Sequence, residues 1–124
     1  MDMRGMRGAT TVNEDQVEQV ISATRELLEA MLTANPGMQT GCIASVFFTV
    51  TDDISSAFPA LAARQMGWDS VPMICAREIP VPGSLPHCIR VLLHWNTDVP
   101  QSAIRHVYLR EAVKLRPDLA SQAQ

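Results

Sequence analysis

One long segment near the N-terminus carries apolar side chains at helical spacing. Residues three or four positions apart share one face of a helix, and this spacing is followed by Val17, Val20, Ile21, Thr24, Leu27, Leu28 and Met31. Before them, residues 13–16 (NEDQ) resemble a capping box with Asn13 as the N-cap. After them, residues 35–37 (NPG) would end the helix. The pattern predicts an amphipathic helix between these two signals.

Five further segments have the apolar content or the alternation of strands, and one resembles a second, short helix. We expect that helix at residues 57–66, because Pro59 lies near its first turn and Gly67 follows its end. The strands are expected at residues 1–12, 43–50, 71–76, 87–95 and 103–113. The order β-α-β-α-β-β-β predicts an α+β fold: a single domain with a mixed five-stranded sheet and two helices packed on one face.

Composition and charge narrow the class of protein. The chain has 124 residues, of which 47% are apolar, as expected for one globular domain. Its net charge of −3 argues against nucleic-acid binding, and no apolar run approaches the roughly 20 residues of a membrane span. Cys42, Cys75 and Cys88 form no CxxC pair, and the N-terminus has no apolar signal segment. We therefore expect reduced thiols and a cytoplasmic protein.

The cations are almost all arginine, and one of them stands inside an apolar strand. Lys114 is the only lysine; arginine binds carboxylates through a planar fork, although a GC-rich genome would produce the same bias. Strand alternation places Cys88, Arg90, Leu92 and His94 on one face. Because an unpaired buried charge is costly, Arg90 needs either a structural carboxylate or an anionic ligand. The sequence leaves both possibilities open.

Other charged residues lie where strands approach loops or glycines. Arg4 and Arg7 have opposite parity, so one of them can face a pocket while the other meets solvent. Gly5 and Gly8 flank Arg7, and a glycine in a strand often marks the close approach of a ligand or another backbone; a bulged edge strand is the alternative. Glu78 follows the third strand and is either a binding group or an exposed loop residue.

The remaining candidates are ambiguous from the sequence alone. Cys75 is typical of a small buried apolar residue, and Tyr108 of a core or interface residue. Arg116 precedes a proline in the tail, from where it could close over a site. There is no close-spaced His or Cys pair, no GxSxG motif and no phosphate-binding glycine loop. We therefore expect neither a metal nor a cofactor.

Taken together, five segments resemble the monofunctional trimeric chorismate mutases. The similarity follows the order and spacing of that family and covers most of the chain outside the first helix. The similar segments are RGMRGATT (4–11), AFPALAAR (57–64), GWDSVPMICAREIPV (67–81), HCIRVLLHWNTDVP (87–100) and IRHVYLREAVKLRPDL (104–119). The resemblance implies a cofactor-free isomerase that converts chorismate to prephenate for aromatic amino-acid biosynthesis. It also implies a homotrimer with active sites between subunits.

The resemblance also assigns site residues. Arg90, Arg7 and Glu78 would be catalytic. Substrate-binding roles would fall on Tyr108 and Cys75, on Phe58, Ala60 and Arg64 of the facing subunit, on Met73 and Ile74, and on Leu115 and Arg116 near the entrance. Leu61 stands where some members carry lysine, and Met73 and Ile74 are bulkier or more apolar than expected. We expect residues 1–116 to form the domain and residues 117–124 a mobile tail.

The expected chemistry is an intramolecular [3,3] rearrangement, in which no proton must move. Arg90 would stabilise the charge on the breaking ether oxygen, Arg7 and Tyr108 would hold a carboxylate or assist at that oxygen, and Glu78 would accept from the ring hydroxyl. A small trimeric imine deaminase and a non-catalytic trimer that binds a carboxylate are the alternatives.

Overall fold

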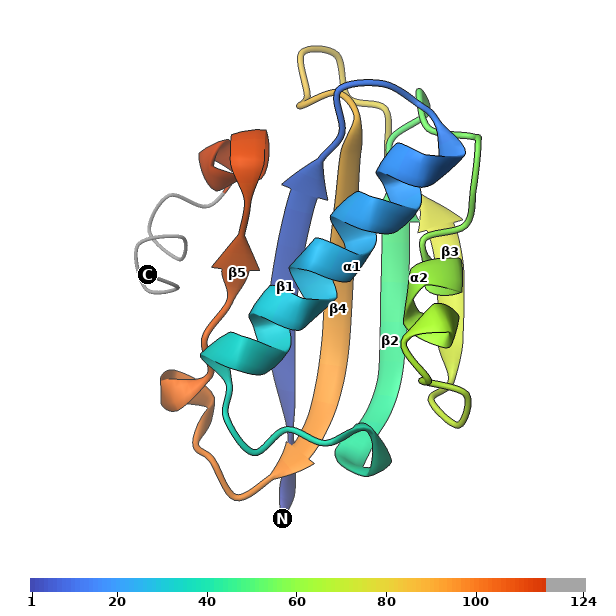
Figure 1. Ribbon diagram of the computed structural model, residues 1–124. Helices are drawn as coiled ribbons and strands as arrows, with labels where there is room; N and C mark the ends of the chain where they lie inside the picture. The colour runs from blue at the N-terminus through green and yellow to red at the C-terminus, as the bar shows by residue number, and fades with distance from the viewer. Residues whose placement is uncertain (116–124) are drawn as a thin grey trace.

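The computed structural model describes residues 1–115 of the chain. Its helices and strands follow one another in the order expected (Figure 1). They are β1 (Asp2–Thr11), α1 (Val17–Ala34), β2 (Ile43–Val50), α2 (Ala60–Gln65), β3 (Met73–Arg77), β4 (Cys88–Thr97) and β5 (Val107–Tyr108). Three short 3₁₀ helices complete the described part, at Thr40–Cys42, Gln101–Ala103 and Arg110–Lys114.

The five strands form one mixed sheet in the order β3-β2-β4-β1-β5. The central strand β4 pairs antiparallel with β1 and with β2, whereas β3 and β5 run parallel to their neighbours. In this register Met6 and Val46 both lie opposite Leu93, so the apolar side chains of three strands share one face. The fold class predicted from the sequence, a mixed five-stranded sheet with two helices, is confirmed.

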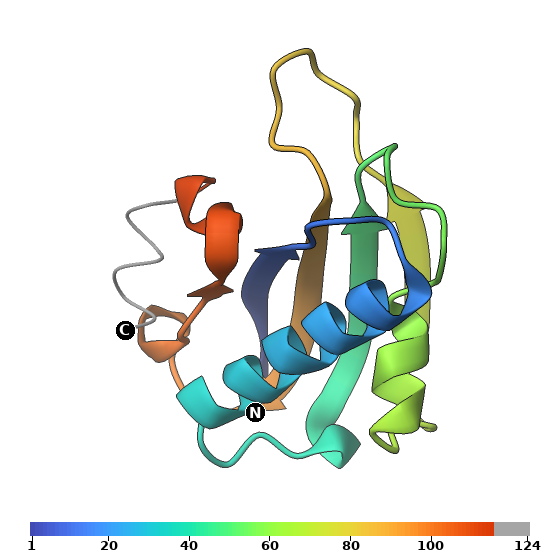
Figure 2. The same ribbon diagram turned by 45° about the horizontal axis from the view of Figure 1, so that its top comes forward.

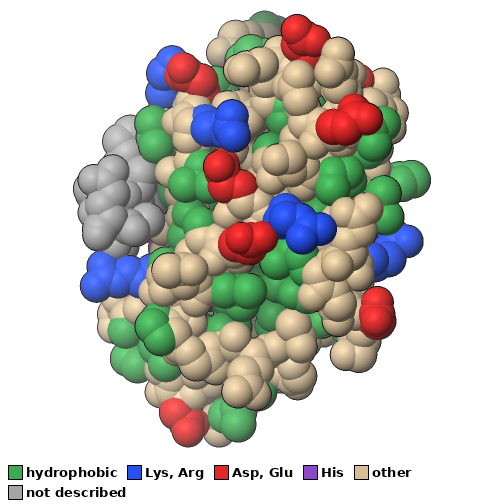
Figure 3. Space-filling view, in the orientation of Figure 1, with side chains coloured by type: hydrophobic (Ala, Val, Ile, Leu, Met, Phe, Trp, Pro, Cys, Tyr) green, Lys and Arg blue, Asp and Glu red, His purple; other side chains and the backbone are tan. Residues whose placement is uncertain are grey.

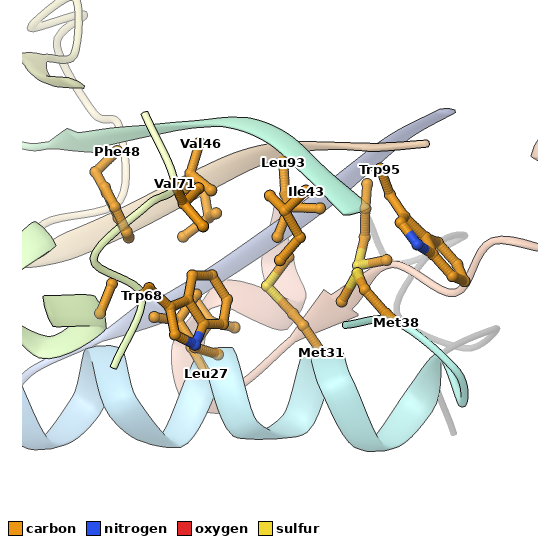
Figure 4. Close-up of a cluster of buried hydrophobic side chains, with 14 of the residues drawn as sticks. Leu27, Met31, Met38, Ile43, Val46, Phe48, Trp68, Val71, Leu93 and Trp95 are labelled. Atoms are coloured by element: carbon orange, nitrogen blue, oxygen red, sulfur yellow. The ribbon is translucent and has the colours of Figure 1, made fainter. Parts of the chain in front are cut away.

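Both helices lie on the same side of the sheet (Figures 1 and 2). The longer helix α1 directs its buried side chains at the sheet, where Leu27 and Met31 meet Phe48 and Leu93 in the core (Figure 4). Gly8 permits this close approach, since a Cβ atom on it would lie 2.6 Å from the Sδ atom of Met31. On the opposite face, residues 1–115 place no α-helix, and only Ala112 of the last 3₁₀ helix packs there against Ala9 and Cys88; we call this the helix-free face.

The start of α1 differs from the prediction. The helix begins at Val17 with Gln16 as its N-cap, and no side chain caps it, so the proposed capping box at Asn13 is wrong. Residues 13–16 instead form a turn in which the carboxylate of Asp15 accepts the backbone N–H groups of Ser55 and Ser56, each at 3.0 Å. A tertiary contact to the loop before α2 therefore replaced the local cap.

The last strand is also much shorter than predicted. Only Val107–Tyr108 pairs with β1, instead of residues 103–113. The backbone of Arg110 has a φ of 54°, in the left-handed region, and this turns the chain from β5 into a 3₁₀ helix. Likewise α2 covers Ala60–Gln65 and not residues 57–66, because Pro59 is its N-cap and Met66 its C-cap.

Candidate active site

The helix-free face of the sheet holds a cavity of about 440 Å³ with charged walls. Arg7 comes from β1, Thr49 from β2, Arg90 from β4, and Glu78 follows β3 directly. Phe47, Val91 and Leu92 complete its lining. Strand parity explains the grouping, because Thr49 lies opposite Arg90 and Phe47 lies opposite Leu92 in the register. Four strand segments thus bring two guanidinium groups and one carboxylate to one hollow, which we call the arginine hollow.

Arg90 and Glu78 form an ion pair at the centre of the arginine hollow. The Nε atom of Arg90 lies 3.7 Å from Oε2 of Glu78, and the two side chains are 30% and 25% exposed. This separation is too long for a hydrogen bond, and Nε of Arg90 is buried without a hydrogen-bond partner among residues 1–115. The hydroxyl of Thr49 donates to the same oxygen of Glu78. The structure therefore supplies a carboxylate beside Arg90 but leaves hydrogen-bonding capacity on the guanidinium.

Arg7 reaches the same hollow from β1. Within residues 1–115 its guanidinium forms no salt bridge, while its backbone N–H donates to Nδ1 of His106 at 2.9 Å. Arg4, with the opposite parity, donates to the carbonyl of Val99 at 3.1 Å and pairs with Asp2. Of the two arginines near the N-terminus, only Arg7 lines the hollow, and its charge is available to an anion there.

A small apolar cluster borders the arginine hollow on the β5 side. Tyr108 and Cys88 are buried in it with Ala9, which lies opposite Arg90 in the sheet, and Leu115 packs against it. Burial raises the pKa of the Cys88 thiol, although the positive charge of Arg90 opposes this shift. Cys88 is therefore an uncharged thiol beside Arg90. The cluster also places Tyr108 and Leu115 on the same side of the sheet as Arg7 and Arg90.

Cys75 and Phe58 line a different cavity, of about 390 Å³, at the β3 edge of the sheet. We call it the β3 hollow. Cys75 lies opposite Phe48 in the register, and its side chain packs on the helix side, away from Arg90. Phe58 is 69% exposed in the loop before α2. One chain therefore does not bring Cys75 and Phe58 together with the three charged residues.

The other predicted site residues are spread over both sides. Ile74 is exposed next to Phe47 on the helix-free face, while Met73 packs partly against the core. Ala60, the first residue of α2, is buried in the core, whereas Leu61 and Arg64 are exposed on the same helix. Arg116 lies outside the described residues.

Sequence reasoning missed the support for Glu78. Thr49 is one of two polar residues, with Ser45, in the apolar strand IASVFFTV, and the register places it directly opposite Arg90. A polar residue in an apolar strand was the available signal. Its hydrogen bond to Glu78 and its place opposite Arg90 could be recognised only once the register of β2 and β4 was known.

Outside the two hollows, acidic and basic side chains are found together. The helix side of the described chain shows acidic and basic side chains interspersed, without a continuous basic stripe (Figure 3). No group of three or more His, Cys, Asp and Glu side chains in residues 1–115 is arranged to hold a metal ion. In the same residues, no helix has the length and apolar character of a membrane span.

The fold and the arginine hollow define an α+β protein in which two guanidinium groups and one carboxylate line a single cavity. Comparison with known proteins identifies the class more closely. The family model for chorismate mutase type I matches residues 3–119, so the chain belongs to this family. The resemblance of its five segments to chorismate mutases, and the expected isomerase activity, are thereby confirmed.

Individual relatives agree with the family. The chorismate mutase AroH of Thermus thermophilus is 62% identical over 119 residues, which cover 96% of this chain and 98% of that protein. The chorismate mutase AroH of Bacillus subtilis is 44% identical over 121 residues, covering 97% and 94% of the two chains. A solved structure of a chorismate mutase from Clostridium thermocellum superposes with a TM-score of 0.85 at 48% identity, covering 87% of this chain and 96% of that one.

Proposed function

We propose that the arginine hollow binds chorismate and promotes its rearrangement to prephenate. The observation that carries this proposal is the convergence of Arg7 and Arg90 on one cavity in which Glu78 is, among residues 1–115, the only carboxylate of the lining. Chorismate is a dianion with a hydroxyl group on its ring. Two guanidinium groups suit its carboxylates, since arginine forms paired hydrogen bonds with that group, and a carboxylate suits its hydroxyl.

The reaction needs orientation and charge stabilisation, and it requires no proton transfer. One C–O bond breaks as one C–C bond forms, so the substrate must be held with its two ends together. Negative charge grows on the ether oxygen as it leaves. Arg90 is our choice of donor to that oxygen, because its Nε atom has no hydrogen-bond partner in the described chain and its position in the central strand is rigid. Such a preorganised donor contributes about 3 to 4 kcal/mol.

Glu78 would accept a hydrogen bond from the ring hydroxyl. The hydroxyl of Thr49 and the charge of Arg90 both act on Oε2 of Glu78, which orients the carboxylate and leaves Oε1 for the ligand. Arg7 and Tyr108 would bind a substrate carboxylate or assist at the ether oxygen, from the opposite side of Arg90.

We further propose that the complete site forms between neighbouring subunits of a homotrimer. The arginine hollow and the β3 hollow lie on different sides of the sheet, so Phe58 and Cys75 would reach the substrate from another copy. Three exposed apolar side chains on the helix-free face support contact with such a copy, namely Phe47, Ile74 and Leu92. Arg64 on α2 would come from the same neighbour.

Two further proposals concern the bounds of the domain and the cellular compartment. Residues 1–116 would form the catalytic domain, and Arg116 with residues 117–124 would cover the entrance beside Leu115. All three cysteines are free thiols, which supports a reducing compartment such as the cytoplasm.

The proposal is tested by following the loss of ultraviolet absorbance of chorismate with purified variants. Arg90→Lys keeps a positive charge but loses the fork, and we expect turnover to fall roughly 100- to 1,000-fold. Arg4→Lys is the matched control, since Arg4 lies on the same sheet with the other parity and should leave turnover unchanged. Turnover close to that of the parent protein in Arg90→Lys would remove Arg90 from the central role.

A further inference from the structure

The outer edge of β1 is closed largely by side chains, in the place where a longer fifth strand was expected. Backbone groups that face this edge occur at every second residue. The N–H and the carbonyl of Gly5 bond to the side-chain amide of Gln101, at 2.9 and 2.7 Å. The N–H of Arg7 donates to Nδ1 of His106 at 2.9 Å. Only from Gly8 onwards does β5 take over, so His106 occupies the last position before regular pairing begins.

His106 is itself held firmly from the preceding residue. Asn35, which is buried at the end of α1, accepts the N–H of Arg105 and donates to its carbonyl, both at 2.9 Å. Immediately after His106, Val107 and Tyr108 pair with Gly8 and Ala9. His106 thus lies between Arg105, whose backbone makes two hydrogen bonds to Asn35, and Val107, where the strand pairing begins.

Two of the proposed site residues, Arg7 on β1 and Tyr108 on β5, depend on that arrangement. The backbone N–H of Arg7 donates a hydrogen bond to His106. Tyr108 follows His106 by two residues and pairs with Ala9 of β1. A shift of this segment along β1 would move Arg7 and Tyr108 relative to each other. Reactions that depend on orientation lose much of their rate after displacements of about 1 Å.

We infer that His106 is a positioning residue of the proposed active site, which aligns β1 with β5 so that Arg7 and Tyr108 converge. This inference rests on the proposed function of the arginine hollow. Because Nδ1 accepts the N–H of Arg7, it carries no proton, and a neutral imidazole then carries its proton on Nε2. The role requires a hydrogen-bond acceptor at the δ position of residue 106 and does not require contact with substrate.

Three variants separate positioning from general support of the fold. His106→Asn retains an acceptor at the δ position, whereas His106→Leu has comparable bulk and no acceptor. We expect kcat/KM for chorismate to fall roughly 10- to 100-fold in His106→Leu and to return to within a few-fold of the parent value in His106→Asn. Gln101→Leu removes two hydrogen bonds from the same edge, at Gly5, and should keep the parent kcat/KM.

A spectroscopic measurement without substrate gives an independent reading. In protein labelled with ¹⁵N, a scalar coupling across the hydrogen bond should join the amide nitrogen of Arg7 to Nδ1 of His106, and it should be absent in His106→Leu. A proton found on Nδ1 of His106 in the neutral parent would overturn the inference. So would equal losses of kcat/KM in His106→Leu and Gln101→Leu, or no recovery in His106→Asn.

The two proposals fail in different ways. A parent protein that does not consume chorismate would overturn the proposed function. A parent that consumes chorismate while His106→Leu matches its kcat/KM would overturn the positioning role alone.

Discussion

Gly8 offers a sharp test of how closely α1 is packed on the sheet. A Cβ atom at this position would lie 2.6 Å from Sδ of Met31 and 3.3 Å from Cδ1 of Leu27. Ordinary contact begins near 3.4 Å, so the sulfur would have to retreat by about 0.8 Å. Met31 and Leu27 are both fully buried in the core, which leaves little space for that movement. Overpacking of this kind costs about 1 to 3 kcal/mol.

Gly5 provides the matched control in the same strand. A Cβ atom there would meet nothing within 4 Å, and its backbone does not require glycine. Gly5→Ala should therefore be neutral or gain about 0.4 to 1 kcal/mol by restricting the unfolded chain. The free energies of unfolding of Gly8→Ala and Gly5→Ala should then differ by about 1 to 4 kcal/mol.

Denaturant unfolding followed by tryptophan fluorescence measures this difference, because Trp68 and Trp95 are both buried. The protein concentration must be equal for all variants, since the stability of the proposed trimer would depend on it. Truncation of Met31 to Ala should cost less in Gly8→Ala than in the parent, because the new methyl group fills part of the cavity. Equal stability of Gly8→Ala and Gly5→Ala would refute the argument that α1 requires glycine beneath it.

Two further predictions concern Glu78 and Asp15. Thr49→Val removes the hydroxyl that donates to Glu78, and turnover should fall roughly 10-fold, whereas Thr49→Ser should retain it; equal kinetics of Val and Ser variants would show that this hydrogen bond does not orient the carboxylate. Hydrogen bonds from Ser56 and Ser55 hold the pKa of Asp15 below its ordinary value of 3.8. Its ionised form therefore stabilises the fold above that pH, and the contribution is lost as the pH falls through the lowered pKa. The difference in free energy of unfolding between the parent and Asp15→Asn should shrink as the pH is lowered below about 3.8, and a constant difference would contradict this account.

The long strands could be predicted because their alternation records which face meets the helices. In β4, Val91, Leu93 and Trp95 are buried in the core while Leu92 is exposed on the other face, so the sequence pattern already contains the two faces of the sheet. The same pattern identified Arg90 as a charge that needs a partner. Local signals were less reliable where a distant contact intervened, as at Asp15, which bonds to the loop before α2 and displaces the expected cap.

The candidate site was harder to assemble than the sheet. Glu78 and Arg90 are brought together by the pairing of β2 with β3 and β4, which no local pattern specifies. The resemblance correctly supplied the family, and it assigned both Cys75 and Glu78 to the site, whereas in one chain their side chains line different hollows. Whether a second copy unites them is a property of the assembly and not of the folding pattern of a single chain.

The way the outer side of β1 is covered also bears on solubility during expression. An exposed strand edge presents free N–H and carbonyl groups that can recruit another polypeptide and start aggregation. Here the amide of Gln101 and the imidazole of His106 occupy those groups along part of β1, and β5 adds only two residues of pairing beyond them. The β1 side of the sheet is therefore a poor template for the addition of a foreign strand. This protection requires no additional full-length strand.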